Sequence, residues 1–151
     1  MFRGANKVTL DAKGRMAMPA RYRDTLVERS EGRLVATVDR ADRCLLIYPL
    51  PDWEEIERKL MRLPTLNPQV RRLQRLMVGH ATELELDSHG RVLVPPKLRE
   101  YAGLTRQAML IGQGSRFELW DEQHWNERRD AWLQVDEETG ELPAELGQLS
   151  L

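Results

Sequence analysis

The chain has 151 residues, of which 41% are hydrophobic and 31% charged, so it can form one ordinary domain or two small interlocked halves. Its single cysteine excludes an intrachain disulfide, and no stretch approaches the roughly 20 apolar residues that span a membrane. The net charge of −1 hides an asymmetry, because residues 1–117 hold 21 Lys and Arg against 14 Asp and Glu, whereas residues 118–151 hold 2 against 10. This split predicts a basic working surface and an acidic tail. The lone cysteine and the absence of a signal-peptide core or membrane span indicate a reducing cytoplasm.

An internal repeat organises the chain. The segment Val8–Pro19 (VTLDAKGRMAMP) returns 76 positions later as Leu84–Pro95 (LELDSHGRVLVP). Each copy holds a short strand, a turn with Asp, Gly and Arg, a second strand and a proline that suits a helix start. The repeat predicts one supersecondary unit used twice and packed about a pseudo-twofold axis.

The first unit is expected to contain a strand, a turn, a second strand, a helix and two further strands. These elements are predicted at Lys7–Leu10, Asp11–Gly14, Arg15–Met18, Pro19–Val27, Leu34–Val38 and Leu45–Tyr48. Cys44 precedes an apolar run and is interpreted as a small core residue rather than a nucleophile.

A helical segment links the two units. Asp52 is predicted to cap a helix that runs to about Arg62, with Glu55 as its capping-box partner. Asn67 followed by Pro68 predicts the start of a second helix.

The second of these helices carries an arginine stripe made of Arg71, Arg72 and Arg75. The stripe is open to three interpretations: a solvated face, a row of salt bridges between subunits with the acidic segment 118–151, or an edge contact with DNA.

The second unit repeats the order of the first. Its elements are predicted at Glu83–Leu86, Arg91–Val94, Pro96–Ala102, Ala108–Ile111 and Phe117–Trp120. Asp121 then caps a last helix whose apolar residues are Trp125, Trp132 and Leu133. Beyond Val135 the chain is acidic and interrupted by Gly and Pro, which predicts a tail that is weakly ordered or docks on a neighbouring subunit.

The chain is therefore divided into four parts. They are the first repeat (5–51), a helical insert (52–80), the second repeat (81–124), and a C-terminal helix with the acidic tail (125–151).

The duplicated turn has the composition of a rigid loop. Gly14 and Gly90 can adopt the positive φ that such a turn needs. Asp11 and Asp87 can accept hydrogen bonds from backbone N–H groups of the loop and so order it.

Each loop presents an arginine at the start of the following strand, Arg15 or Arg91. A guanidinium on a rigid base can fork onto a phosphate or onto the O6/N7 edge of guanine. Lys13 lies inside the first loop, and Arg23 and Arg99 lie one helical turn beyond the strands. These five residues are predicted to contact DNA. In the simpler alternative, each loop arginine only pairs with the aspartate of its own turn.

The segment Leu10–Pro19 resembles the looped-hinge, swapped-hairpin motif of AbrB-type bacterial DNA-binding proteins. Two tandem copies, the opening Met1–Gly4, the insert ending at Gly79–Ala81 and the sequence FELWD at Phe117–Asp121 are more similar still to the MraZ family. The resemblance covers nearly the whole chain and is weakest after Val135.

The resemblance implies an α+β fold in which two tandem AbrB-like repeats interlock as a pseudo-dimeric swapped-hairpin β-barrel with peripheral helices. It implies a cytoplasmic, nucleoid-associated transcriptional regulator that represses its own operon in the division and cell-wall gene cluster. Such a regulator binds short direct repeats of promoter double-stranded DNA as a ring-like homo-oligomer. The family's D-x-x-x-R motif falls here on Asp11 with Arg15 and on Asp87 with Arg91. His89 stands where the first copy has Lys13, so the second loop contributes less charge.

An enzyme is not expected. His80, His89 and His124 share no metal-binding spacing with one another or with Cys44, and the chain has no P-loop, nucleophile elbow or dinucleotide fingerprint. No catalytic residue, metal ligand, cofactor, membrane partner or small-molecule substrate is predicted.

The alternative function is a protein-interaction or antitoxin-like module that uses the same swapped hairpin without specific DNA reading. The four tryptophans would suit that role, although packing at the helix–sheet junction is favoured for them. They are Trp53, Trp120, Trp125 and Trp132.

Overall fold

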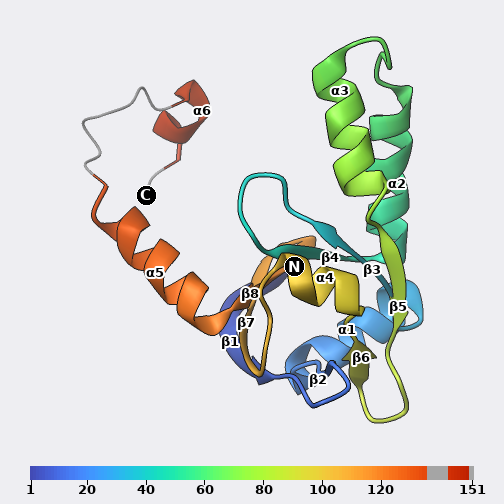
Figure 1. The fold of residues 1–151 in the computed structure, drawn as a ribbon, viewed down its shortest axis with the longest axis vertical. Coiled ribbons are helices and arrows are strands. Elements are labelled where there is room, and N and C mark those ends of the chain that lie inside the picture. Colours follow the sequence, from blue (N-terminus) through green and yellow to red (C-terminus); the bar gives the residue numbers. More distant parts are fainter. Residues whose placement is uncertain (136–142, 150–151) are drawn as a thin grey trace.

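The computed structural model describes residues 1–135 and 143–149, which form a mixed α and β structure around one antiparallel sheet (Figure 1). Six strands pair in the order β1-β7-β8-β4-β3-β5, and β2 and β6 pair separately as a two-stranded ribbon. The predicted α+β class is therefore confirmed.

The first repeat supplies four strands and one helix. They are β1 (Phe2–Thr9), β2 (Arg15–Ala17), α1 (Ala20–Ser30), β3 (Arg33–Val38) and β4 (Leu45–Pro49). β1 begins earlier than the predicted Lys7, because Phe2 is buried against the rings of Tyr22 and Phe117 at centroid distances of 5.7 and 4.3 Å. An aromatic side chain at the start of the chain thus anchors the whole strand to the core.

The insert forms a helical hairpin that protrudes from the sheet (Figure 1), made of α2 (Leu50–Arg62), α3 (Pro68–Leu73) and the π-helical turn η1 (Gln74–Val78). Asn67 caps α3 as predicted. The predicted capping box of α2 is wrong, because Asp52 lies inside the first turn and accepts a hydrogen bond from Arg29 at 2.7 Å. Glu55 pairs instead with Lys59 at 3.3 Å.

The second repeat supplies the remaining strands, and two helices follow it. The elements are β5 (Thr82–Glu85), β6 (Arg91–Leu93), α4 (Pro96–Tyr101), β7 (Gln107–Gly114), β8 (Arg116–Asp121), α5 (Glu122–Leu133) and α6 (Ala144–Gly147). Asp121 caps α5 as predicted by accepting a hydrogen bond from the His124 N–H at 3.0 Å. The predicted tail beyond Val135 falls in part on residues 136–142 and 150–151, which lie outside the described residues.

The two repeats are interlocked, because strands of one pair with strands of the other. β1 pairs with β7, β2 with β6, β3 with β5 and β4 with β8, all antiparallel. Neither repeat therefore completes the sheet alone. The division of the chain into the four parts stays a prediction.

The predicted closed barrel is wrong. The sheet is open, with β1 and β5 at its edges, and the ribbon reaches β1 only through the single bridge between Leu10 and Met16. β2 and β6 pair with each other over three residues and are not part of the six-stranded order, so the described strands form no closed circuit.

Side chains on the two faces of the sheet pack into different cores. One face meets the ribbon, α1 and α4 in the main core, where Leu34 and Ile47 are fully buried. The other face meets α2 through Trp53 and meets α5 through Trp120. β3 and β4 are therefore buried on both faces, which explains their continuous apolar runs.

The tryptophans divide between core and surface. Trp53 and Trp120 are buried, as the favoured packing interpretation predicts, whereas Trp132 on α5 is 42% exposed. α5 leaves the body of the molecule (Figure 1), and none of its residues is fully buried. The sequence did not show this, because the positions of apolar residues along a helix do not reveal whether a partner covers them.

Candidate nucleic-acid interface

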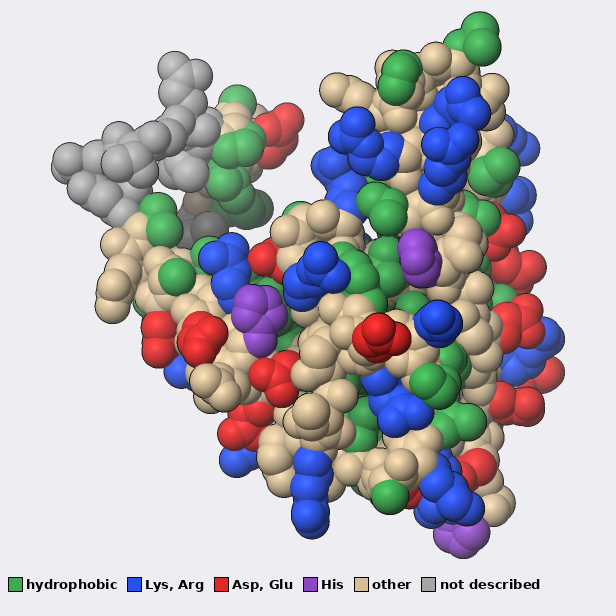
Figure 2. Space-filling view, viewed as in Figure 1, with side chains coloured by type: hydrophobic (Ala, Val, Ile, Leu, Met, Phe, Trp, Pro, Cys, Tyr) green, Lys and Arg blue, Asp and Glu red, His purple; other side chains and the backbone are tan. Residues whose placement is uncertain are grey.

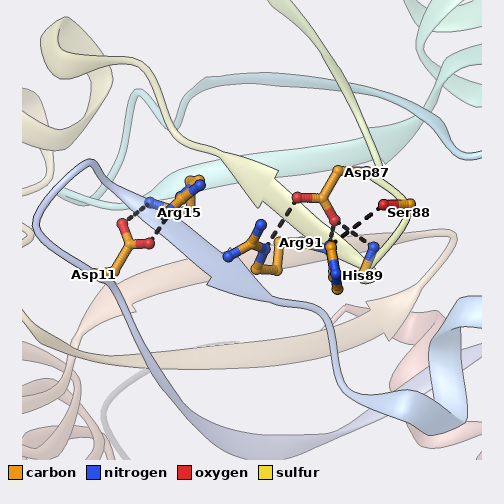
Figure 3. Close-up of polar contacts among 6 residues, drawn as sticks. All are labelled: Asp11, Arg15, Asp87, Ser88, His89 and Arg91. Carbon is orange, nitrogen blue, oxygen red and sulfur yellow. Dashed lines mark hydrogen bonds and ion pairs between the residues drawn. The ribbon is translucent and has the colours of Figure 1, made fainter.

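The first loop, Asp11–Arg15, is held by its own aspartate. Asp11 Oδ1 accepts hydrogen bonds from the backbone N–H groups of Lys13 and Arg15, both at 2.9 Å. Asp11 Oδ2 accepts one from Arg15 Nε at 2.8 Å (Figure 3). Gly14 has the positive φ of 88° that lets its own N–H reach the Asp11 carbonyl at 2.9 Å. One carboxylate thus fixes both the loop backbone and the arginine.

The second loop, Asp87–Arg91, repeats this network. Asp87 Oδ1 accepts from the N–H groups of His89 and Arg91 at 2.8 and 2.9 Å, and Oδ2 accepts from Arg91 Nε at 3.0 Å. Gly90 has a φ of 73° and donates to the Asp87 carbonyl at 3.0 Å. The loops therefore have the same internal order although only Asp, Gly and Arg are common to them.

Both aspartates are held in the charged form. The hydrogen bond from the Arg15 backbone N–H lowers the pKa of Asp11, and the bond from the Arg91 backbone N–H lowers that of Asp87. Hydrogen bonds to a carboxylate favour its ionised form. At neutral pH each loop thus has a fixed anion at its base and a cation at its exit.

The β2–β6 ribbon brings the two arginines together. Met16 pairs with Val92 at its centre, and both side chains are buried in the main core. Arg15 lies opposite Leu93, and Arg91 lies opposite Ala17, so strand alternation places both arginines on the outer face. Diagonal positions of this kind are about 7–8 Å apart. Figure 3 shows the two guanidinium groups over the ribbon, between Asp11 and Asp87.

Each guanidinium keeps hydrogen-bonding capacity for a ligand. The side chains of Arg15 and Arg91 are 32% and 33% exposed. Within the described residues only their Nε atoms donate to protein, so the terminal nitrogens have no protein acceptor there. The pairing of each arginine with the aspartate of its own turn is thus present, and it uses Nε while the two terminal nitrogens can still donate to a ligand.

The surroundings of the two loops differ in charge. Exposed Lys13 stands at the tip of the first loop, and exposed His89 stands at the tip of the second. A groove of about 640 Å³ behind the first loop is lined by Arg99 and Arg106 among others. The corresponding groove behind the second loop, about 360 Å³, is lined by Arg23 but also by Glu31. The first loop therefore offers the more positive surface.

Sequence reasoning missed Arg106. It follows α4 and precedes β7, and its carbonyl accepts the Leu10 N–H at 2.8 Å, which fixes the connection beside the first loop. In the sequence, Arg106 is a single basic residue between two predicted elements. The first repeat has no basic residue at the matching position, so the repeat did not draw attention to it.

Arg23 and Arg99 are half-buried, and they belong to α1 and α4 rather than to the ribbon. Arg23 Nε donates to the Met18 carbonyl at 2.7 Å, and Arg99 Nε donates to the Val94 carbonyl at 3.0 Å. The side chain of each arginine also lies over a glycine of the other repeat, Arg23 over Gly90 and Arg99 over Gly14.

A second polar cluster lies elsewhere, on the face of the sheet that meets α5. Ligand atoms of Asp39, Cys44 and Glu118 lie within 4.8 Å of one another. Burial raises the pKa of the Cys44 thiol and of the Glu118 carboxyl. Cys44 donates to Asp39 Oδ2 at 3.6 Å, and Trp120 Nε1 donates to Glu118 Oε1 at 2.9 Å. The first bond lies within the β3–β4 loop and the second within β8, so the two segments are adjacent here without a printed hydrogen bond between them. Cys44 is the buried core residue that its apolar neighbours predicted.

Together the fold and the paired loops define a class: an α+β protein of two interlocked repeats, each displaying an Asp-x-x-Gly-Arg loop on a shared ribbon. A family model described as MraZ protein, antitoxin-like, matches residues 1–76 and again residues 77–139. The chain belongs to the MraZ family.

Relatives in this family are similar over their entire length. The chain is 62% identical over 151 residues to Transcriptional regulator MraZ of Thioalkalivibrio sulfidiphilus, and 59% identical over 152 residues to that of Halorhodospira halophila. It is 57% identical over 151 residues to that of Pseudomonas aeruginosa. Each comparison covers 100% of both chains.

No helix in the described ranges 1–135 and 143–149 has the length and apolar character needed to cross a membrane.

Proposed function

We propose that the protein is a transcriptional regulator, not an enzyme, and that it binds double-stranded DNA through the outer face of the β2–β6 ribbon. The observation that carries the proposal is the pair of arginines on that face, each ordered by the aspartate of its own loop. The printed names of the relatives, which are those of transcriptional regulators, support the same kind of function.

The shape of the ribbon suits the major groove. That groove is about 12 Å wide and admits a two-stranded ribbon, whose outward side chains then meet base edges. Arg15 and Arg91 contact bases or phosphates, and the exposed Lys13 contacts a phosphate. Asp11 and Asp87 stay on the protein side, ordering the arginines.

Assembly is the second part of the proposal. One ribbon grips DNA at two loops, and a few phosphate contacts alone give only weak, non-specific binding. We propose a ring-like homo-oligomer that engages successive direct repeats of a promoter, so that several weak contacts act together. Exposed apolar side chains on the described surface, such as Leu66 (93%) and Leu133 (77%), are available for contacts between copies.

The regulatory setting follows from the resemblance to the family. We propose that the protein acts in the cytoplasm at the nucleoid and represses its own operon in the division and cell-wall gene cluster. The family is also described as antitoxin-like, which is consistent with the alternative function, a protein-interaction module with the same hairpins.

A salt titration separates the two functions. Binding of the purified protein to DNA from upstream of its own gene is measured by fluorescence anisotropy between 50 and 300 mM salt. Phosphate contacts require the affinity to fall steeply and linearly in log–log form as salt rises. An affinity that is absent, or that does not change with salt, would favour the protein-interaction module.

A further inference from the structure

A pair of contacts crosses between the repeats and is itself duplicated. Built on the backbone, a Cβ at Gly90 would lie 2.6 Å from Arg23 Nε, and a Cβ at Gly14 would lie 2.5 Å from Arg99 Nε. Arg23 belongs to the first repeat and Gly90 to the second, whereas Arg99 belongs to the second and Gly14 to the first. Each arginine therefore lies on the bare backbone of the opposite loop.

Hydrogen bonds continue each contact. Arg23 Nε donates to the Met18 carbonyl, and the Met18 N–H donates to the Gly90 carbonyl at 2.9 Å. In the other half, Arg99 Nε donates to the Val94 carbonyl, and the Val94 N–H donates to the Gly14 carbonyl at 2.9 Å. A short chain of bonds thus links each arginine to the loop that it covers.

We propose that Arg23 and Arg99 are positioning residues, each of which holds the DNA-binding loop of the opposite repeat. The proposal rests on the function proposed above, and it reassigns these two residues, which the sequence predicted as DNA contacts. Arg23 orders the second loop, Asp87–Arg91, and Arg99 orders the first loop, Asp11–Arg15.

The chemistry requires glycine on one side and arginine on the other. Both glycines have positive φ and no side chain. The Cδ, Nε and Cζ atoms of the arginine can therefore lie directly on the backbone of the glycine. Arginine has an N–H at the ε position, where it reaches the carbonyl while the stem stays packed. Lysine keeps the charge but has no donor at that point of its chain. We call the contact of each arginine with the opposite loop, together with its Nε hydrogen bond, the brace. A positive charge alone therefore does not replace the brace.

Hydrogen exchange of the free protein tests the brace without DNA. Arg23→Ala and Arg23→Lys should each raise amide exchange in the second loop roughly three- to tenfold, the scale of one ordinary hydrogen bond, and leave the first loop unchanged. Arg99→Ala and Arg99→Lys should do the reverse. Arg29→Ala is the matched control, because Arg29 lies on the same helix as Arg23 but pairs with Asp52. Faster exchange in the loop of the same repeat, or in neither loop, would overturn the proposal.

A double-mutant cycle on DNA tests the consequence for binding. If Arg23 acts through the second loop, Arg23→Ala should cost little further affinity once Arg91→Ala is present, but its full cost beside Arg15→Ala. Rescue of affinity by Arg23→Lys, additivity with both loop variants and a salt slope reduced by about 1 would instead show a direct phosphate contact and overturn the positioning role. If the wild-type protein binds no DNA, the proposed function fails, and the exchange measurement still decides whether the brace exists.

Discussion

At the scale of single residues, mutation of the loop aspartates tests whether they order the loops for DNA binding. An anion beside phosphates should weaken DNA binding, so a purely electrostatic view predicts that its removal tightens the complex. The structure gives Asp11 three hydrogen bonds to the loop, which makes it an ordering residue. The two effects have opposite signs and can be separated by mutation.

We expect Asp11→Ala to weaken DNA binding several-fold, because Lys13 and Arg15 lose their common anchor. Asp11→Asn is the matched variant, since an amide oxygen can still accept the two backbone N–H groups and should retain part of the affinity. Asp24→Ala, at an exposed position of α1, serves as the control for a lost negative charge. Tighter binding by Asp11→Ala with an intact fold would show that the ordering role is incorrect.

Glu118 provides a pH-dependent prediction at the same scale. Burial raises its pKa above the ordinary value of 4.5, so the folded state holds the proton more firmly than the unfolded state. The stability from this group is complete below pH 4.5 and is lost as pH rises through the folded pKa. Wild-type protein should therefore lose unfolding free energy relative to Glu118→Gln over that range, as urea titrations can measure. Glu85→Gln on exposed β5 is the control, and equal pH profiles for wild type and Glu118→Gln would contradict the prediction.

At the scale of elements, the ribbon depends on tight turns that only glycine fits. Gly14 combines a φ of 88° with the contact to Arg99, whereas Gly103 has a φ of 63° and nothing within 4 Å of a Cβ. A comparison of the two separates backbone strain from crowding.

We expect Gly103→Ala to cost about 1–2 kcal/mol, the price of a left-handed alanine. Gly14→Ala should cost more, by roughly 1–3 kcal/mol, because Arg99 must also move. Chemical denaturation of both variants gives the difference directly. Equal costs would mean that Arg99 moves aside freely and that the contact contributes nothing.

At the scale of the whole molecule, basic side chains lie over the helical hairpin, near the ribbon and at several positions between them (Figure 2). Figure 2 shows Lys and Arg over the protruding α2–α3 hairpin, and Lys, Arg and His near the lower end of the view, where Figure 1 places the ribbon. Arg71, Arg72 and Arg75 are exposed and form no ion pair within the described residues. The stripe is solvated in the single chain, and its role as a solvated face, a salt-bridge row with a neighbouring copy or an edge contact with DNA stays a prediction.

Assembly on repeated DNA can be measured. Affinity should rise steeply from one promoter repeat to three, beyond the statistical factor for extra sites, because linked sites share a high effective concentration. Light scattering without DNA should report an oligomer at micromolar concentration. A monomer in scattering, or equal affinity for the single and triple repeats, would contradict the proposed assembly.

Much of this fold could be predicted from the sequence because the same local motif occurs twice in the chain. Short-range rules predict the two loops, their ordering by Asp11 and Asp87, and the strands that follow them. The full length of β1 and the failed Asp52 cap could not be predicted, since Phe2 and Arg29 act through partners distant in sequence. The open sheet and the contacts of Arg23 with Gly90 and of Arg99 with Gly14 are likewise consequences of how the repeats pair.

The most direct test of the central claim is DNA affinity after removal of the ribbon arginines. Arg15→Ala and Arg91→Ala should each lower affinity for upstream DNA by about 1–3 kcal/mol and relax its specificity where a base is read, with little change in thermal stability. Arg58→Ala, an exposed arginine on α2, should bind as the wild type does. Unchanged binding of the double variant Arg15→Ala/Arg91→Ala would contradict the claim that this ribbon recognises DNA.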